Sequence, residues 1–441
     1  MRGMRFLILL IIAIPLGWYA YYDSKKGAVD DTPKKDKVFT VESDKIDEIE
    51  VKSESGDRTT LRKKGSDWEI VQPLTATPDP SAVSGITSNL SSVEMQRVID
   101  ENAADLKEFG LDSPRVEVAF KANGQQHRLL LGQKTPAGSD VYAKLPDSKR
   151  VFLVPSFLDS TLNRSTFDLR DKTVLKVDRE KVDSLEVATK DRTMRFDKKN
   201  GEWQIAKPAA GRAEFGAVDG LVSRVSSVQM KSIVPDATDL KKYGLDKPVA
   251  TVRLGSGSSQ ASLAIGSAAE SGNVYAKDLS RPAVFTIESS LADDLKKDAS
   301  EYRQKDLFDA RSFNTTRLEI VHNNQSAVFE KTKVKTKDGK EEEKWKQTAP
   351  AAKDVDASKV EALIAAATGA RATGFVDSTA KTGLEKPELT VAFKYDEGKD
   401  ERVTFARTKD AAYAARAGSP GAAKVDASTI DSIVKALGDV K

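Results

Sequence analysis

A five-residue cluster, Gly-Leu-acid-x-Pro, occurs three times along this chain of 441 residues, at intervals of 134 and 139 residues. Each copy follows a tryptophan and, five residues after that tryptophan, a proline. The recurring residues are Trp68, Pro73, Gly110, Leu111 and Pro114; Trp203, Pro208, Gly244, Leu245 and Pro248; and Trp345, Pro350, Gly383, Leu384 and Pro387. A period this long indicates a tandem array of whole domains, because solenoid repeats are much shorter.

The array predicts three repeat domains of equal length. We place them at residues 37–171, 172–306 and 307–441. The chain length agrees with about three domains, each large enough to bury a core of its own.

The segment ahead of the first repeat has the pattern of a membrane signal. Residues 6–22 carry no charge, follow Arg2 and Arg5, and end in a cluster of aromatic residues. We predict a cytoplasmic start at residues 1–5, a single transmembrane anchor at 6–22 and a polar tether at 23–36. A cleaved signal peptide is the alternative, but a cut after Ala20 would put bulky Trp18 where a small residue is needed. The bulk of the chain is then expected to cross the membrane.

The composition narrows the possible chemistry. The chain contains no cysteine, which excludes disulfides, thiolate catalysis and cysteine zinc sites. The formal net charge is +3, with basic and acidic residues interspersed, so nucleic acid is not expected as the main partner.

Within each repeat, alternating apolar residues predict antiparallel strands, followed by a helix. The strand that carries the tryptophan should end at the proline, which cannot donate to the sheet. The helices should begin after Asp79, Glu214 and Asp356, and aspartate is the better cap. The predicted fold is therefore α+β, with each mostly antiparallel sheet covered by one or two helices.

The recurring residues are interpreted as structural. A buried tryptophan contributes a large apolar area, so core anchors are favoured over aromatic platforms for a ligand. The Gly-Leu-acid-x-Pro cluster fits a helix stop followed by a turn, because glycine adopts the left-handed conformation and proline prevents continuation. Its acidic residues could instead be metal ligands or catalytic acids, but each repeat carries only one of them: Asp112, Asp246 and Glu385.

No catalytic, cofactor or metal site is expected. His127 and His322 have no ligand at metal-binding spacing and resemble surface strand residues. Gly255 to Ser259 lacks the lysine of a phosphate loop and fits a hairpin. Arg170 and Arg303 precede the predicted junctions and could pin neighbouring repeats, or bind anionic headgroups.

The third repeat carries an additional charged stretch at Lys331 to Lys346. A lengthened hairpin turning at Asp338-Gly339 explains it, and a contact arm for a partner is the functional alternative. The candidate contact residues are Lys333, Lys335, Lys337 and Lys340.

The combination of an N-terminal anchor, W-x-I-x-x-P, a capped helix, Gly-Leu-Asp-x-Pro and L-x-x-G resembles a bacterial family, domain-of-unknown-function family 4340. The L-x-x-G motif lies at Leu129 to Gly132 and Leu263 to Gly266. The third repeat departs from the pattern at Gln347 and Ala406. The resemblance implies an envelope protein associated with ABC-type transporters, similar to the auxiliary subunit of gliding-motility transporters, and it implies no active site.

These observations lead to one expected function and two alternatives. The expected function is a non-enzymatic, membrane-anchored periplasmic scaffold that contacts an ABC-type permease or another envelope assembly. The first alternative is a glycan- or lipid-binding module, which would show a concave pocket in one repeat only. The second is a hydrolase, which would gather His127 or His322 with a serine and an aspartate.

Overall fold

The computed structural model describes Trp18 and residues 36–440, except 336–340 and 397. The predicted anchor, apart from Trp18, the segment before it and nearly all of the tether lie outside the described residues. In the described part, no helix has the length and apolarity needed to cross a membrane. The chain divides into two compact units, one ending at Asp171 and the other beginning at Lys172.

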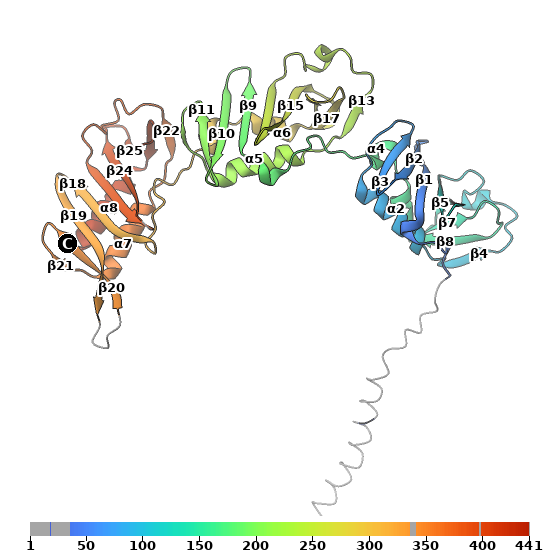
Figure 1. The fold of residues 1–441 in the computed structure, drawn as a ribbon, viewed down its shortest axis with the longest axis horizontal. Coiled ribbons are helices and arrows are strands. Elements are labelled where there is room, and N and C mark those ends of the chain that lie inside the picture. Colours follow the sequence, from blue (N-terminus) through green and yellow to red (C-terminus); the bar gives the residue numbers. More distant parts are fainter. Residues whose placement is uncertain (1–17, 19–35, 336–340, 397, 441) are drawn as a thin grey trace, which may run out of the picture. The chain divides into compact units, whose positions relative to one another are not determined.

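The described part of the chain is mostly β, with three antiparallel sheets and few helices (Figure 1). The first sheet has the order β3-β2-β1-β5-β6-β7-β8-β4. Its strands are β1 (Ile46–Lys52), β2 (Arg58–Lys64), β3 (Asp67–Gln72), β4 (Arg97–Asp100), β5 (Val116–Ala122), β6 (Gln125–Lys134), β7 (Asp140–Lys144) and β8 (Val151–Pro155).

The second and third sheets repeat this order and add one short strand at the edge. The second comprises β9 (Ser184–Thr189), β10 (Thr193–Lys199), β11 (Glu202–Lys207), β12 (Gly211–Arg212), β13 (Ser232–Val234), β14 (Ala250–Ser256), β15 (Ser259–Ala268), β16 (Asn273–Asp278) and β17 (Val284–Glu288). The third comprises β18 (Thr315–His322), β19 (Gln325–Lys335), β20 (Glu341–Ala349), β21 (Lys353–Asp354), β22 (Gly374–Val376), β23 (Leu389–Tyr395), β24 (Lys399–Arg407), β25 (Ala412–Arg416) and β26 (Ala422–Val425).

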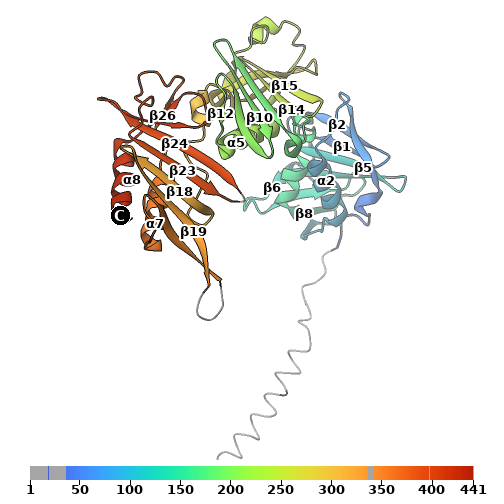
Figure 2. The ribbon, with the colours of Figure 1, turned by 60° about the vertical axis from the view of Figure 1, so that its left-hand side comes forward.

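Each sheet is packed against helices. The helix after the tryptophan strand is α2 (Pro80–Ser92), α5 (Phe215–Ser227) or α7 (Ala357–Thr368), and the helix after the last strand is α3 (Ser156–Leu162), α6 (Ser289–Leu295) or α8 (Ala427–Val440). The first repeat adds α4 (Thr166–Leu169). Figures 1 and 2 show α7 and α8 side by side against the third sheet. Their apolar faces complete its core, in which Ile430, Ile433 and Val360 are fully buried.

The local predictions around the tryptophan are confirmed. Strands β3, β11 and β20 each end at the residue before the recurring proline of their repeat, and all three X-Pro bonds are cis. The Asp79 carboxylate accepts from the backbone N–H of Ser81 at 2.8 Å and so caps α2. Glu214 forms no side-chain cap bond at α5, as expected for the poorer cap.

The helix stop is found in two repeats. Short 3-10 helices η2 (Lys107–Phe109) and η4 (Leu240–Tyr243) end at Gly110 and Gly244, which have φ of +64° and +66°. The last residue of each packs on a tyrosine, with ring centroids 5.0 Å apart for Phe109 and Tyr142 and 4.9 Å apart for Tyr243 and Tyr275.

In the third repeat the predicted short helical segment is wrong, because the residues before Gly383 form a turn. Thr382 occupies the place of the aromatic residue, so no ring anchors a 3-10 helix there. This difference also explains why alanine, at Ala406, is tolerated where the other repeats have the glycine of the L-x-x-G motif. In the first two repeats a Cβ at Gly132 or Gly266 would lie 2.2 Å or 2.1 Å from the carbonyl oxygen of Phe109 or Tyr243.

Candidate functional site

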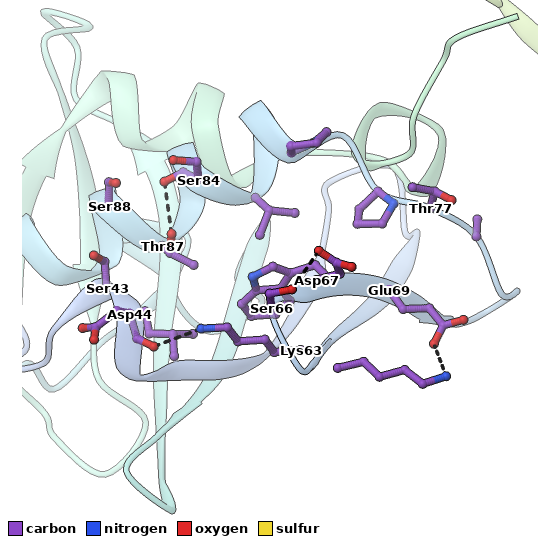
Figure 3. Close-up of a pocket in the computed structure, with 17 residues that line it drawn as sticks. Ser43, Asp44, Lys63, Ser66, Asp67, Glu69, Thr77, Ser84, Thr87 and Ser88 are labelled. Atoms are coloured by element: carbon purple, nitrogen blue, oxygen red, sulfur yellow. Dashed lines mark hydrogen bonds and ion pairs between the residues drawn. The ribbon is translucent and has the colours of Figure 1, made fainter. Parts of the chain in front are cut away.

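The first repeat contains a groove of about 720 Å³ beside its tryptophan (Figure 3). The 3-10 helix η1 (Ser43–Lys45), the β2–β3 hairpin and the first half of α2 form its walls. Figure 3 shows Ser84, Thr87 and Ser88 along α2, facing the side of the groove that carries Asp44 and Lys63. The volume falls within the usual range for small-molecule sites.

Trp68 lines this groove and is half-buried. Its neighbour across the β2–β3 pair is Lys63, but the Lys63 ammonium donates to the backbone carbonyl of Asp44 at 3.2 Å. Within the described residues, the Trp68 indole forms no hydrogen bond and no cation lies over its ring. Part of the ring packs against the core of the repeat, and the remainder faces the groove without a cation over it.

The corresponding tryptophans of the other repeats are closed off. Trp203 and Trp345 are 2% and 4% exposed, as predicted for core anchors. The paired lysines cover their rings, with Lys198 Nζ 5.6 Å from the Trp203 centroid and Lys331 Nζ 5.3 Å from the Trp345 centroid. The interpretation as a core anchor thus holds fully for these two tryptophans and only partly for Trp68.

Three further positions of the groove carry larger residues in the second repeat. Phe215 stands where the first repeat has Pro80, and Lys198 Nζ lies 5.6 Å from its ring. Arg179, from the 3-10 helix η3 (Arg179–Lys181), forms a 2.6 Å ion pair with Asp219 on α5. The first repeat has serines at both of these positions, Ser43 and Ser84, and among its described residues no ion pair joins η1 to α2.

Most charged side chains around the groove make a contact within the protein. Lys64 and Glu69 form an ion pair at 3.9 Å, and Ser66 donates to the Asp67 carboxylate at 3.3 Å. A hydrogen bond from Lys45 lowers the pKa of the Asp44 carboxyl below its usual value. In the residues that the structure describes, no group of three or more His, Asp or Glu side chains could hold a metal ion.

The two histidines lie in ordinary strand environments. His127 on β6 stacks on Phe120 with 5.0 Å between ring centroids and contacts Phe39 at 5.7 Å. His322 ends β18 opposite Gln325, where the strand turns into β19. Within the described range, neither imidazole forms a hydrogen bond with a serine or an aspartate side chain.

The acidic residues of the three Gly-Leu-acid-x-Pro clusters are exposed turn residues, whereas Leu111 and Leu245 are buried at 3% and 7% exposure. Arg303 stacks its guanidinium on Phe375 at 4.4 Å, and burial lowers its pKa. Arg170 pairs with Pro78 through an isolated β-bridge within the first unit.

The charged stretch of the third repeat forms the long hairpin β19–β20. Among the described residues, β18 pairs with β19 only as far as Glu330. The rest of β19, residues 331–335, pairs only with residues 341–345 of β20. Lys333 Nζ lies 3.8 Å from the Glu341 carboxylate. Of the other predicted contact residues, Lys335 ends β19, while Lys337 and Lys340 lie outside the described residues.

The groove is not visible in the motifs that the three repeats share, because it depends on positions at which the repeats differ. The available signal was the replacement of Arg179, Asp219 and Phe215 by smaller residues in the first repeat. Each replacement is unremarkable alone, and only the fold brings the three positions together.

A family model described as a domain of unknown function (DUF4340) matches the chain twice, over residues 68–206 and 203–387. Each match begins at a tryptophan of the repeat. No curated protein matches the chain.

Proposed function

Because the chain belongs to the DUF4340 family, a domain of unknown function, we propose that it is a non-enzymatic interaction protein of the bacterial cell envelope. Its N-terminal segment anchors it in the inner membrane, and the three repeats stand in the periplasm. There it serves as an auxiliary component of an ABC-type transporter or of another envelope assembly. The uncharged run at residues 6–22 and the family's implied association with transporters support this proposal.

The observation that carries the proposal is the β19–β20 arm, by which we mean residues 331–335 and 341–345. It extends beyond the rest of its sheet (Figure 1), whereas the equivalent strands β2 and β10 have seven residues each. Its two strands have backbone edges that pair with no other described strand. A partner strand or loop can therefore add to either edge through backbone hydrogen bonds.

The charges of the arm favour a folded protein partner over self-association. Lysine occupies every second residue of β19 from 331 to 335, and glutamate occupies residues 341–343 of β20. Charged side chains on a free edge discourage nonspecific pairing of sheets. The same charges give an interface its register and its selectivity for a partner of complementary charge.

Site-specific crosslinking in intact cells tests the proposal. A photoreactive residue replaces exposed Lys333 in the full-length chain, and a matched control carries it at exposed Lys199 on the equivalent hairpin of the second repeat. We expect a crosslink from position 333 to a permease subunit or another envelope protein, and none from position 199. Equal crosslinking at both positions, or none at either, would contradict the proposal.

A further inference from the structure

We propose that the groove beside Trp68 is a binding site for an uncharged carbohydrate. This inference does not depend on the proposed role in an envelope assembly, because it rests on one groove in the first repeat. Three properties of that groove identify the ligand class: an aromatic ring that no cation covers, walls rich in hydroxyl groups, and more carboxylates than lysines among its described lining residues.

The aromatic face is the first property. The π-face of an indole is electrostatically negative and attracts weakly positive C–H groups. One side of a pyranose ring presents such C–H groups in a nearly flat array. In the other two repeats a lysine ammonium occupies this position over the tryptophan, at 5.6 Å and 5.3 Å from the ring centroid. In the first repeat Asp44 holds the equivalent ammonium of Lys63 away through its carbonyl oxygen.

The walls supply the second property. Ser43, Ser84 and Ser88 are exposed at the groove and come from η1 and α2. A serine hydroxyl both donates and accepts hydrogen bonds, as every sugar hydroxyl does. Asp67 adds carboxylate oxygens, which accept from sugar hydroxyls. The groove can therefore satisfy a ligand whose polar groups all act in both directions.

The charge balance supplies the third property and separates carbohydrate from phosphate. Both lysines of the lining are engaged, Lys63 with the Asp44 carbonyl and Lys64 with Glu69. An anionic headgroup would compete with these contacts and would approach three carboxylates, those of Asp44, Asp67 and Glu69. Repulsion between like charges disfavours that approach.

An acyl chain fits the groove no better. Ile46 and Val83 line it, but they are 0% and 3% exposed and belong to the core of the repeat. Most of the remaining lining is polar, and burying those polar groups against hydrocarbon without new hydrogen bonds costs free energy.

In the second repeat, an ion pair spans the positions that correspond to the groove. The Arg179–Asp219 ion pair bridges the two positions at which the first repeat has Ser43 and Ser84. The double substitution Ser43→Arg with Ser84→Asp should build the same bridge in the first repeat. It would block the groove without removing Trp68.

The experiment titrates the full-length chain with neutral tetrasaccharides, namely cellotetraose, chitotetraose, maltotetraose and mannotetraose, followed by calorimetry and by tryptophan fluorescence. We expect at least one to bind. Trp68→Ala should weaken that binding at least about tenfold, through loss of the stacking contact. The Ser43→Arg/Ser84→Asp variant should weaken it similarly while retaining the thermal unfolding of the unaltered protein.

The matched control is Phe157→Ala, which removes an aromatic ring 58% exposed on α3 of the same repeat and outside the groove. It should bind as the unaltered chain does. Failure of all four tetrasaccharides to bind at millimolar concentration would overturn the proposal, and so would binding that is insensitive to both groove variants. Trp68-dependent binding to vesicles containing anionic lipid, with no binding to the tetrasaccharides, would also overturn it and assign the groove to a headgroup.

Discussion

The ammonium of Lys198 lies 5.6 Å from the ring centroid of Trp203, and Trp203 is 2% exposed beneath it. The equivalent pair in the first repeat, Lys63 and Trp68, does not make this contact, and Trp68 is half-buried. The same position of the repeat therefore holds a buried core residue in the second repeat and a partly exposed groove residue in the first.

The first prediction compares these two tryptophans. Trp203→Ala should lower the free energy of unfolding by about 3 to 5 kcal/mol, the usual cost of emptying an aromatic site in a core. Trp68→Ala should cost roughly half of that or less, because part of the ring is already in water. Denaturant titration of the full-length variants, followed by circular dichroism, measures both values. Equal losses would show that Trp68 is as much a core residue as Trp203.

The second prediction concerns the helix caps. Asp79→Ala should destabilise the first repeat by about 1 kcal/mol, because the backbone N–H groups of Ser81 and Ala82 lose their acceptor. Glu214→Asp should stabilise the second repeat by up to about 1 kcal/mol, because Glu214 forms no cap bond at α5. Thermal unfolding checks both signs. A Glu214→Asp variant that melts at a lower temperature would refute the capping argument.

The third prediction concerns the glycine of the L-x-x-G motif. Gly266→Ala should destabilise the second repeat by about 1 to 3 kcal/mol, because the new Cβ would lie 2.1 Å from the Tyr243 carbonyl oxygen. Gly220→Ala on α5 is the control, since its Cβ meets no atom within 4 Å and alanine favours helix. Opposite shifts in denaturation midpoint are expected, and shifts of the same sign would contradict the close-approach explanation.

The fourth prediction concerns a buried carboxylate that the motifs do not reveal. Glu401 accepts hydrogen bonds from the backbone N–H groups of Asp309 and Ala310, at 3.0 Å and 2.8 Å, and pairs with Arg416 at 3.1 Å. Its side chain is 1% exposed. Glu401→Gln should lower the free energy of unfolding by about 2 to 4 kcal/mol, because it leaves buried donors and a guanidinium poorly satisfied.

The control for this prediction is Glu388→Gln. Glu388 pairs with Arg407 at 3.3 Å, and both side chains are 32% exposed. Its loss should cost under about 1 kcal/mol, as is usual for surface ion pairs. If the two variants unfolded at the same denaturant concentration, the buried Glu401 contacts would stabilise the fold no more than the surface ion pair does.

The fifth prediction is a pH dependence. Burial, together with the nearby Asp294 carboxylate, raises the pKa of Tyr302 to about 12. The folded protein therefore holds the phenolic proton more tightly than the unfolded chain, whose tyrosine titrates near its ordinary value of 10. The resulting stability is complete below about pH 10 and is lost as the pH rises toward about 12.

Tyr302→Phe isolates this contribution. The free energy of unfolding of the unaltered chain, minus that of the variant, should fall by an amount on the order of 2 kcal/mol at most between about pH 9 and pH 11.5. Urea titrations at a series of pH values give this difference. A difference that stays constant with pH would mean that Tyr302 titrates normally in the folded protein.

The local elements of each repeat could be predicted because their causes lie within a few residues. Proline ends a strand wherever it falls in one, and Asp79 caps a helix through its own carboxylate. The turn that replaces the short helix before Gly383 could not be predicted in the same way. In the first two repeats that helix depends on an aromatic ring packing on a tyrosine from a distant strand, as Phe109 does on Tyr142.

The sequence by itself determined the tandem array, the positions of the tryptophan strands and the helix that follows each of them, because periodicity and capping act locally. Only the tertiary structure decided which tryptophan is accessible. That outcome depends on Ser43, Lys63 and Ser84, which lie on three separate elements and meet in one groove. Side chains that are distant along the chain together set the burial of the tryptophan and its access to a ligand. The same motif can therefore anchor the core in the second and third repeats and line an open groove in the first.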